Sequence, residues 1–131
     1  MRVARKSIEP FKATVSFGLN KGYTDELISK EAIIREINDY QSKLANEKDI
    51  YLSISISETI ITLIGQQEPH LVFNFINYPR FPLQVQELKQ TIEHLIRQLM
   101  STFQQNRVVV EYLDETVMLE FSSEVDPKII Q

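Results

Sequence analysis

The hydrophobic pattern changes its period several times along the chain, and each change predicts a new element. Residues 11–19 and 70–78 alternate apolar and polar positions, as half-buried strands do. Residues 50–57 alternate more strictly, with four aliphatic residues on one side and a tyrosine and three serines on the other. Apolar alternation also flanks Glu58-Thr59 and Asp114-Glu115. These two dipeptides therefore predict the turns of two hairpins.

Two other segments repeat their apolar residues at spacings of three and four, which predicts amphipathic helices. The first helix is expected to begin after Ser29 as N-cap, with Ile28 and Ile33 at the positions of a hydrophobic staple. The second is expected to begin with Pro82 in its first turn and to end near Asn106. The two apolar stripes consist of Ile33, Ile37, Tyr40 and Leu44, and of Val85, Leu88, Ile92, Leu95, Leu99 and Phe103.

This order of elements predicts an α+β fold, with an antiparallel sheet and two helices packed on one face. The order β-α-β-β occurs twice, in residues 11–64 and 70–121, so a tandem pseudo-repeat is expected. The Glu-Thr dipeptide that both hairpins contain lies one residue out of the register that aligns their faces, so the repeat rests on the pattern alone. The alternative is a ferredoxin-like β-α-β-β-α-β sheet with an added C-terminal hairpin. In architecture, the doubled order resembles the effector-binding barrels of some bacterial regulators.

Length and composition indicate one globular domain. The chain has 131 residues, of which 43% are hydrophobic and 24% charged. Residues 1–10 are predicted to form a basic N-terminal arm and residues 122–131 a tail. The chain has no cysteine, which excludes disulfides and thiolate metal sites, and no apolar run of the length that a membrane span needs. We therefore expect a cytoplasmic protein.

Charge and motifs exclude several classes of function. The net charge is −4, and an acidic body repels the phosphates of a nucleic acid. The sequence has no Walker loop, no Rossmann glycine pattern, no zinc spacing and no nucleophile elbow. We therefore expect no cofactor, no metal, no nucleic acid and no membrane partner.

The connections between a strand and the following helix carry the candidate binding residues. The first connection contains Lys21 and Tyr23, and the second contains Tyr78, Arg80 and Phe81. Each offers a cation beside an aromatic ring, and the guanidinium of Arg80 suits a carboxylate or a phosphate. Because related halves would place these connections equivalently, the five residues are predicted to bind a small anionic or aromatic ligand.

The leading functional prediction is a non-catalytic binding or protein-interaction module that forms a homodimer. The strand over 70–78 carries apolar residues on both faces, and Ser53, Ser55 and Ser57 form a face of small side chains. Both features suit association of two copies through the sheet.

Two alternatives remain open. One is a small cofactor-free enzyme, an isomerase or hydrolase, that uses carboxylates or His70. The acidic residues around the last hairpin (Glu111, Asp114, Glu115 and Glu120) are more typical of a solvated edge, and the polar run 104–107 is more typical of an ordinary helix end. The other alternative is an acidic subunit or immunity-like protein that docks on a basic partner.

Overall fold

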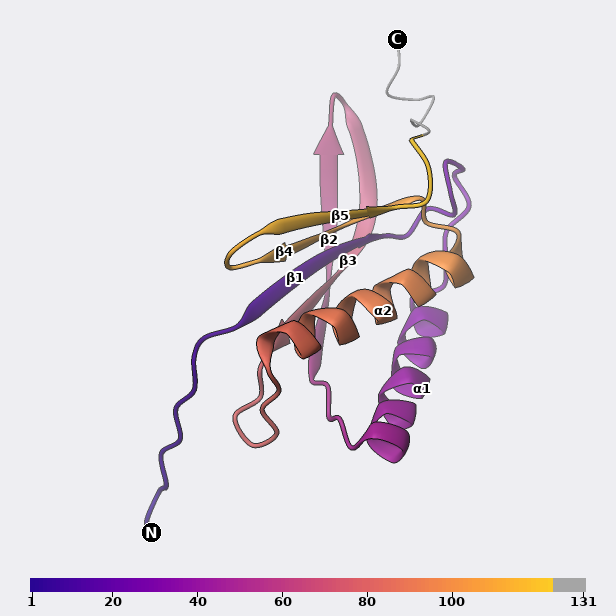
Figure 1. The fold of residues 1–131 in the computed structure, drawn as a ribbon. Coiled ribbons are helices and arrows are strands. Elements are labelled where there is room, and N and C mark those ends of the chain that lie inside the picture. Colours follow the sequence, from indigo (N-terminus) through magenta and orange to yellow (C-terminus); the bar gives the residue numbers. More distant parts are fainter. Residues whose placement is uncertain (124–131) are drawn as a thin grey trace.

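The computed structural model describes residues 1–123, which contain one antiparallel sheet with both helices on one of its faces (Figure 1). The elements in chain order are β1 (Lys12–Gly18), α1 (Lys30–Lys48), β2 (Ile54–Leu63), β3 (Gln66–Ile76), α2 (Val85–Phe103), β4 (Arg107–Tyr112) and β5 (Thr116–Glu120). The five strands lie in the order β2-β3-β1-β4-β5. The predicted α+β class is confirmed. The part of the predicted tail that follows residue 123 lies outside the described residues.

The topology corresponds to the alternative prediction. The elements from β1 to β4 follow the β-α-β-β-α-β order, β1 lies between β3 and β4, and β5 adds one edge strand. The tandem repeat is not confirmed, because the first half lacks its predicted hairpin. Glu58 and Thr59 lie inside β2, where they pair with Leu71 and His70 of β3.

The turn lies instead at Ile64 and Gly65, between β2 and β3. Both residues have positive φ, at 48° and 77°. A two-residue hairpin turn of this kind requires positive φ at both positions, and glycine adopts it without steric cost. Thr59 and Ile60 are β-branched and favour extended backbone, so the chain does not turn after Glu58. Residues 66–69, predicted as loop, consequently form the start of β3.

The first helix begins as predicted and the second does not. The Ser29 side chain caps α1 by accepting a hydrogen bond from Ala32 N–H at 3.2 Å. The α2 helix begins at Val85 rather than near Pro82, because the Asn77 side chain binds both the N–H and the C=O of Leu83 and holds that residue in the loop. It ends at Gln104, whose left-handed backbone (φ 58°) stops the helix two residues before Asn106.

Both helical stripes pack on the same face of the sheet. The predicted residues of α1 are all buried, and so are Leu88, Ile92, Leu95 and Leu99 of α2. They meet inward residues of β1 and β3 such as Phe17 and Phe73, whose ring centroids lie 5.8 Å apart. Complete burial of one such side chain contributes about 1.5–3 kcal/mol. The opposite, open face carries polar groups, among them Thr14, which donates a hydrogen bond to Asn74 at 2.9 Å.

The β2–β3 hairpin extends beyond the rest of the sheet (Figure 1). The pairing of β1 with β3 stops at Gly18 and His70, so the residues of β3 before His70 pair only with β2. Four aliphatic side chains of this protruding part are exposed: Ile60, Ile61, Leu63 and Ile64. Within residues 1–123, no helix is long and apolar enough to cross a membrane.

Candidate functional site

The two strand-to-helix connections lie at opposite ends of the sheet, because β1 and β3 run antiparallel and their carboxyl ends point in opposite directions (Figure 1). Lys21 and Tyr23 lie in the β1–α1 connection, whereas Tyr78, Arg80 and Phe81 lie in the β3–α2 connection. The structure therefore does not bring the five predicted residues into one site. Each connection instead borders a pocket of its own.

A polar pocket, which we call the His70 pocket, lies at the carboxyl end of β1. Its volume is about 160 Å³. It is lined by Gly18, Asn20, Gly22, Tyr23, Glu68, His70, Gln105, Asn106 and Arg107. Clefts that enclose a drug-sized ligand measure ~300–1,000 Å³. The His70 pocket therefore fits one polar part of such a molecule, with the remainder lying along the open face of the sheet.

Gln105 is the buried polar residue at the base of this pocket, with 8% of its surface exposed. Its Nε2 donates a hydrogen bond to the Asn20 carbonyl at 2.6 Å. A Cβ on Gly18 would lie 3.0 Å from Gln105 Oε1, so only glycine at that position leaves the amide this space. Asn20 Oδ1 is also buried and accepts no hydrogen bond within the described residues. The base of the pocket thus holds a polar oxygen that a bound donor would satisfy.

The orientation of His70 is fixed by the backbone. Its Nδ1 lies 3.1 Å from the carbonyl oxygen of Glu68. A carbonyl only accepts hydrogen bonds, so Nδ1 carries a proton and neutral His70 has its lone pair on Nε2. A Cβ on Gly18 would lie 3.5 Å from His70 Nε2, so this nitrogen and Gln105 Oε1 both lie next to Gly18. The pocket therefore contains an oriented nitrogen base.

Tyr23 and the polar residues after α2 form the rim. Asn106 Nδ2 donates to the Tyr23 hydroxyl at 2.9 Å, and Asn106 Oδ1 accepts from Ser122 N–H at 3.1 Å. Arg107 Nε lies 2.7 Å from Glu120 Oε2. The sequence prediction for 104–107 is thus wrong in part, because three residues of this run line the pocket and Gln105 is buried. The sequence could not show that these residues line a pocket, because they do so only where the loop over 19–29 folds against them.

The second pocket, which we call the aromatic pocket, lies at the other end of the sheet. Its volume is about 250 Å³, and it is lined by Gln41, Tyr51, Leu52, Ser53, Tyr78 and Phe81. Arg80 lies beside it, with its guanidinium carbon 5.7 Å from the centre of the Phe81 ring. Three of the five predicted ligand-binding residues therefore gather here. Gln41 and Tyr51 had no sequence signal, since they come from a helix face and from the segment before β2.

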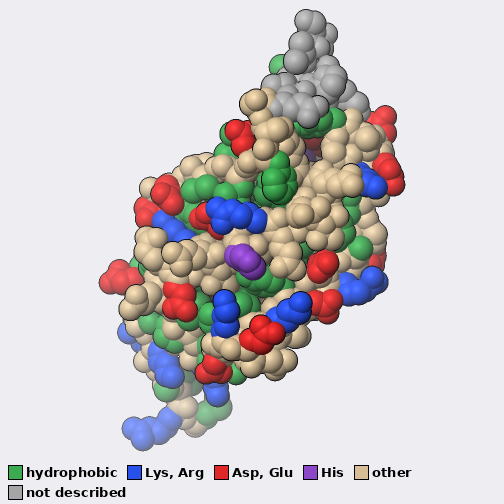
Figure 2. Space-filling view, turned by 45° about the vertical axis from the view of Figure 1, so that its right-hand side comes forward, with side chains coloured by type: hydrophobic (Ala, Val, Ile, Leu, Met, Phe, Trp, Pro, Cys, Tyr) green, Lys and Arg blue, Asp and Glu red, His purple; other side chains and the backbone are tan. Residues whose placement is uncertain are grey.

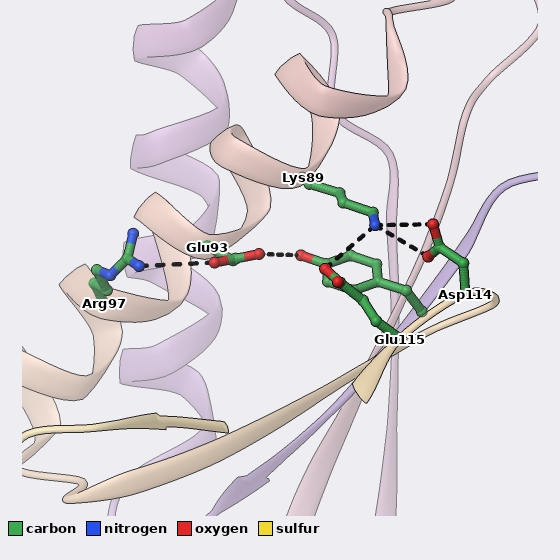
Figure 3. Close-up of polar contacts among 6 residues, drawn as sticks. Lys89, Glu93, Arg97, Asp114 and Glu115 are labelled. Carbon is green, nitrogen blue, oxygen red and sulfur yellow. Dashed lines mark hydrogen bonds and ion pairs between the residues drawn. The ribbon is translucent and has the colours of Figure 1, made fainter. Parts of the chain in front are cut away.

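The acidic residues of the last hairpin do not form an acid–base pair. Glu111 pairs with Thr116 and Glu120 with Arg107, so these two carboxylates lie at opposite ends of the hairpin. Asp114 and Glu115 bind the buried Lys89 ammonium at 3.0 and 3.3 Å (Figure 3).

The ammonium of Lys89 also lies 4.5 Å from the centre of the Tyr112 ring. Burial and a 2.7 Å hydrogen bond to Glu93 raise the pKa of the Tyr112 hydroxyl. This cluster therefore joins α2 to the hairpin through ion pairs and hydrogen bonds.

The helical face carries charges of both signs. Figure 2 shows lysine and arginine side chains interspersed with aspartate and glutamate rather than gathered in one patch. His94 is exposed, as predicted, and its Nδ1 lies 2.8 Å from the Tyr40 hydroxyl. No group of three or more histidine, aspartate or glutamate side chains that could hold a metal ion occurs within residues 1–123.

Comparison with known proteins finds a likeness in structure only. No protein-family model matches the sequence, and no curated protein does. A phage SAM lyase in complex with S-methyl-5'-thioadenosine superposes with a TM-score of 0.66 at 17% identity, covering 95% of this chain and 100% of the other. A phage SAM lyase in the apo state gives 0.59 at 17% identity, over 88% and 91% of the two chains. At this identity the likeness shows the fold.

This likeness corrects the leading functional prediction. The two solved structures reported above are phage SAM lyases, which are enzymes, so the non-catalytic module is contradicted and the enzyme alternative is better supported. That prediction rested on the apolar residues on both faces of the strand over 70–78 and on the serines at 53, 55 and 57, features that suit association but do not exclude catalysis.

Proposed function

We propose that this protein is a cofactor-free lyase that acts on S-adenosylmethionine (SAM) and releases S-methyl-5'-thioadenosine, with the His70 pocket as its active site. The observation that carries the proposal is the fold that it shares with the SAM lyase over the full length of that protein. The His70 pocket supports it, because it contains an oriented base, a carboxylate and hydrogen-bonding rim residues.

The proposed reaction balances without a co-reactant. When the bond between sulfur and Cγ of the methionine part breaks, its electron pair moves to sulfur, which neutralises the sulfonium and yields the thioether. Cγ of the four-carbon fragment then regains the lost electron pair in one of two ways. Either its own carboxylate oxygen attacks Cγ and closes a lactone ring, or a proton leaves Cβ and a double bond forms. Neither route requires water, metal or a redox cofactor.

The residues of the pocket take roles that follow from their chemistry. In the elimination route, His70 Nε2 takes the Cβ proton, since its lone pair faces the pocket. In the ring-closing route no base is needed, and the same nitrogen accepts a hydrogen bond from the substrate ammonium. The Glu68 carboxylate attracts the sulfonium and ammonium charges, and Lys21, in the connection between the lining residues Asn20 and Gly22, attracts the substrate carboxylate. The net charge of −4 favours a cationic substrate in the same way.

The test is to incubate the protein with SAM and to identify both products by mass spectrometry. Wild-type protein should form S-methyl-5'-thioadenosine together with a lactone or an unsaturated amino acid. In the elimination route, His70→Gln should lower kcat about 100-fold or more, the typical contribution of a positioned base. In the ring-closing route, His70→Gln should instead raise KM, because the nitrogen then only binds the substrate ammonium. Glu68→Gln should raise KM in both routes, because it removes the charge that attracts the cationic substrate. His94→Gln changes the other histidine, which lies on the helical face, and should retain wild-type turnover. Absence of the thioether product, or equal loss in His70→Gln and His94→Gln, would refute the assignment.

Self-association and location remain proposals from the sequence. The exposed aliphatic residues of the β2–β3 hairpin and the open face of the sheet support association of two copies. A second copy on the open face would enclose the part of SAM that the His70 pocket cannot hold. Light scattering that gives only the monomer mass of 15.3 kDa would contradict this proposal. We propose a cytoplasmic location, as expected from the absence of cysteine.

A further inference from the structure

We propose that the aromatic pocket is a second site, separate from the His70 pocket, that binds an adenine nucleotide such as adenosine monophosphate (AMP). Three features carry the proposal: a cluster of exposed aromatic rings, a side-chain amide with one fixed hydrogen bond, and a guanidinium at the edge. They would bind the ring faces, the edge of the base and the phosphate, respectively.

The rings provide a surface for stacking. Phe81 lies against Tyr51 with ring centroids 4.6 Å apart, and against Tyr78 with centroids 6.1 Å apart and planes inclined by 28°. The three rings are 39–44% exposed, although such large aromatic surfaces are usually buried. Stacking on an aromatic side chain contributes about 1–3 kcal/mol per base. A planar ring that covers this cluster would remove exposed apolar surface from water.

The amide of Gln41 matches the edge of adenine. Its Nε2 donates to the Leu52 carbonyl at 2.8 Å, and because a carbonyl only accepts, this bond fixes which end of the amide is nitrogen. One N–H and the Oε1 oxygen remain for a ligand. Adenine presents an acceptor nitrogen beside its exocyclic amino group, the pair that glutamine recognises with two hydrogen bonds. At the edge formed by N7 and the 6-position, hypoxanthine has a carbonyl in place of that amino group, so it offers two acceptors and no donor there.

Arg80 supplies the contact for the phosphate. Its guanidinium stacks beside Phe81 and makes no ion pair within residues 1–123. Arginine binds phosphate with two parallel hydrogen bonds, so a nucleotide stacked on Phe81 would place its charged group within the reach of this side chain.

The loop that carries these residues is already ordered for binding. Asn77 bonds to Leu83 N–H and C=O at 2.9 and 2.8 Å, which closes the loop, and Phe81 N–H donates to the Tyr78 carbonyl at 3.0 Å. Pro79 and Pro82 restrict the backbone further. Little conformational entropy is therefore lost when a ligand binds.

Isothermal titration with AMP, adenosine and inosine monophosphate (IMP) tests the three contacts separately. AMP should bind more tightly than adenosine, and IMP should bind at least fivefold more weakly than AMP. Phe81→Leu should weaken AMP about tenfold or more. Arg80→Gln should reduce AMP affinity to that of adenosine while leaving adenosine affinity unchanged. Gln41→Leu should remove the difference between AMP and IMP.

The same titrations separate this proposal from the proposed lyase activity. AMP should bind the His70→Gln variant as it binds wild type, whether or not either protein acts on SAM. Loss of AMP binding in that variant would place the nucleotide in the His70 pocket and overturn the second site. Equal affinities for AMP and IMP, an Arg80→Gln effect on adenosine, or no binding of AMP to the wild type would overturn it as well.

Discussion

The two pockets differ in the length of chain that builds them. The His70 pocket is held together by side chains that lie far apart in the sequence, since the Gln105–Asn20 and Asn106–Tyr23 hydrogen bonds span 85 and 83 residues. In the aromatic pocket, the loop that carries Tyr78 and Phe81 is closed locally by Asn77 and Leu83, six residues apart, and only the opposite wall comes from the distant segment around Gln41 and Tyr51. A polar site assembled from distant segments depends on the whole fold, whereas a closed loop keeps its shape through its own contacts.

This contrast predicts the largest effect for Gln105→Ala. The change removes the side chain of a buried residue and leaves the Asn20 carbonyl without its partly buried hydrogen bond, which should lower the free energy of unfolding by about 1–3 kcal/mol. It should also slow the release of S-methyl-5'-thioadenosine with no change in AMP affinity. Urea titration and the two assays measure these effects, and Gln104→Ala, at the exposed neighbouring position, is the control. A weaker AMP affinity in Gln105→Ala would mean that the two pockets are coupled.

A smaller effect is expected for Asn77→Ala at the other end of the sheet. The loop is partly exposed, so the loss of two hydrogen bonds to Leu83 should cost about 1 kcal/mol. AMP affinity should fall because the loop must then be ordered on binding, while turnover of SAM stays at the wild-type value. If Asn77→Ala slows turnover as much as Gln105→Ala does, the local character of the aromatic pocket is disproved.

The smallest effect concerns the Lys89 cluster, which borders neither pocket and reports on overall stability alone. The hydrogen bond from Lys89 lowers the pKa of Asp114 below its ordinary 3.8, and the hydrogen bond to Asp114 raises the pKa of Lys89 above 10.5. The contribution of Asp114 is thus present above pH 3.8 and is lost as the pH falls through its lowered pKa. The contribution of Lys89 is present below pH 10.5 and is lost at higher pH.

Melting temperatures measured from neutral to acidic pH test this contribution. Asp114→Asn should be less stable than wild type at neutral pH, and the difference should shrink on acidification. Glu111→Gln, which changes a carboxylate on the same hairpin without an ion pair within the described residues, is the matched control. A constant deficit of Asp114→Asn at every pH would show that the ion pair does not contribute.

The sequence predicted those features that depend on local periodicity. The spacing of apolar residues predicts the burial of Ile33 and Ile37 and the packing of both helices on one face. The cap at Ser29 follows from one side-chain hydrogen bond. The prediction of a turn at Glu58-Thr59 was wrong because two strands joined by a turn and one long strand show the same alternation of apolar and polar residues. Only the positive φ at Ile64 and Gly65 distinguishes the two cases, and the single glycine marks the correct place.

The candidate site was harder to predict, for a physical reason. Aromatic and cationic residues near Tyr78 signal binding by their type, so the aromatic pocket was found in part. Gln105 and Gly18 carry no such signal, because an amide and a missing Cβ become informative only when the fold places the amide against the glycine, where a Cβ would lie 3.0 Å from Gln105 Oε1. The prediction that the two strand-to-helix connections occupy equivalent places was also wrong, because it depended on the unconfirmed repeat.

The short turn at Ile64 and Gly65 has a consequence for the order of folding. It joins β2 to β3 with continuous pairing from Ile54 with Phe75 to Leu63 with Gln66, so this hairpin needs only local loop closure and should form on a microsecond timescale. Docking of β1 closes a longer loop and follows more slowly. Still longer loops are closed by the pairing of Ala13 in β1 with Tyr112 in β4 and by the contact of Gln105 with Asn20, so these contacts form last. A nascent chain would therefore acquire its hairpin early and its His70 pocket only when nearly all of it is folded.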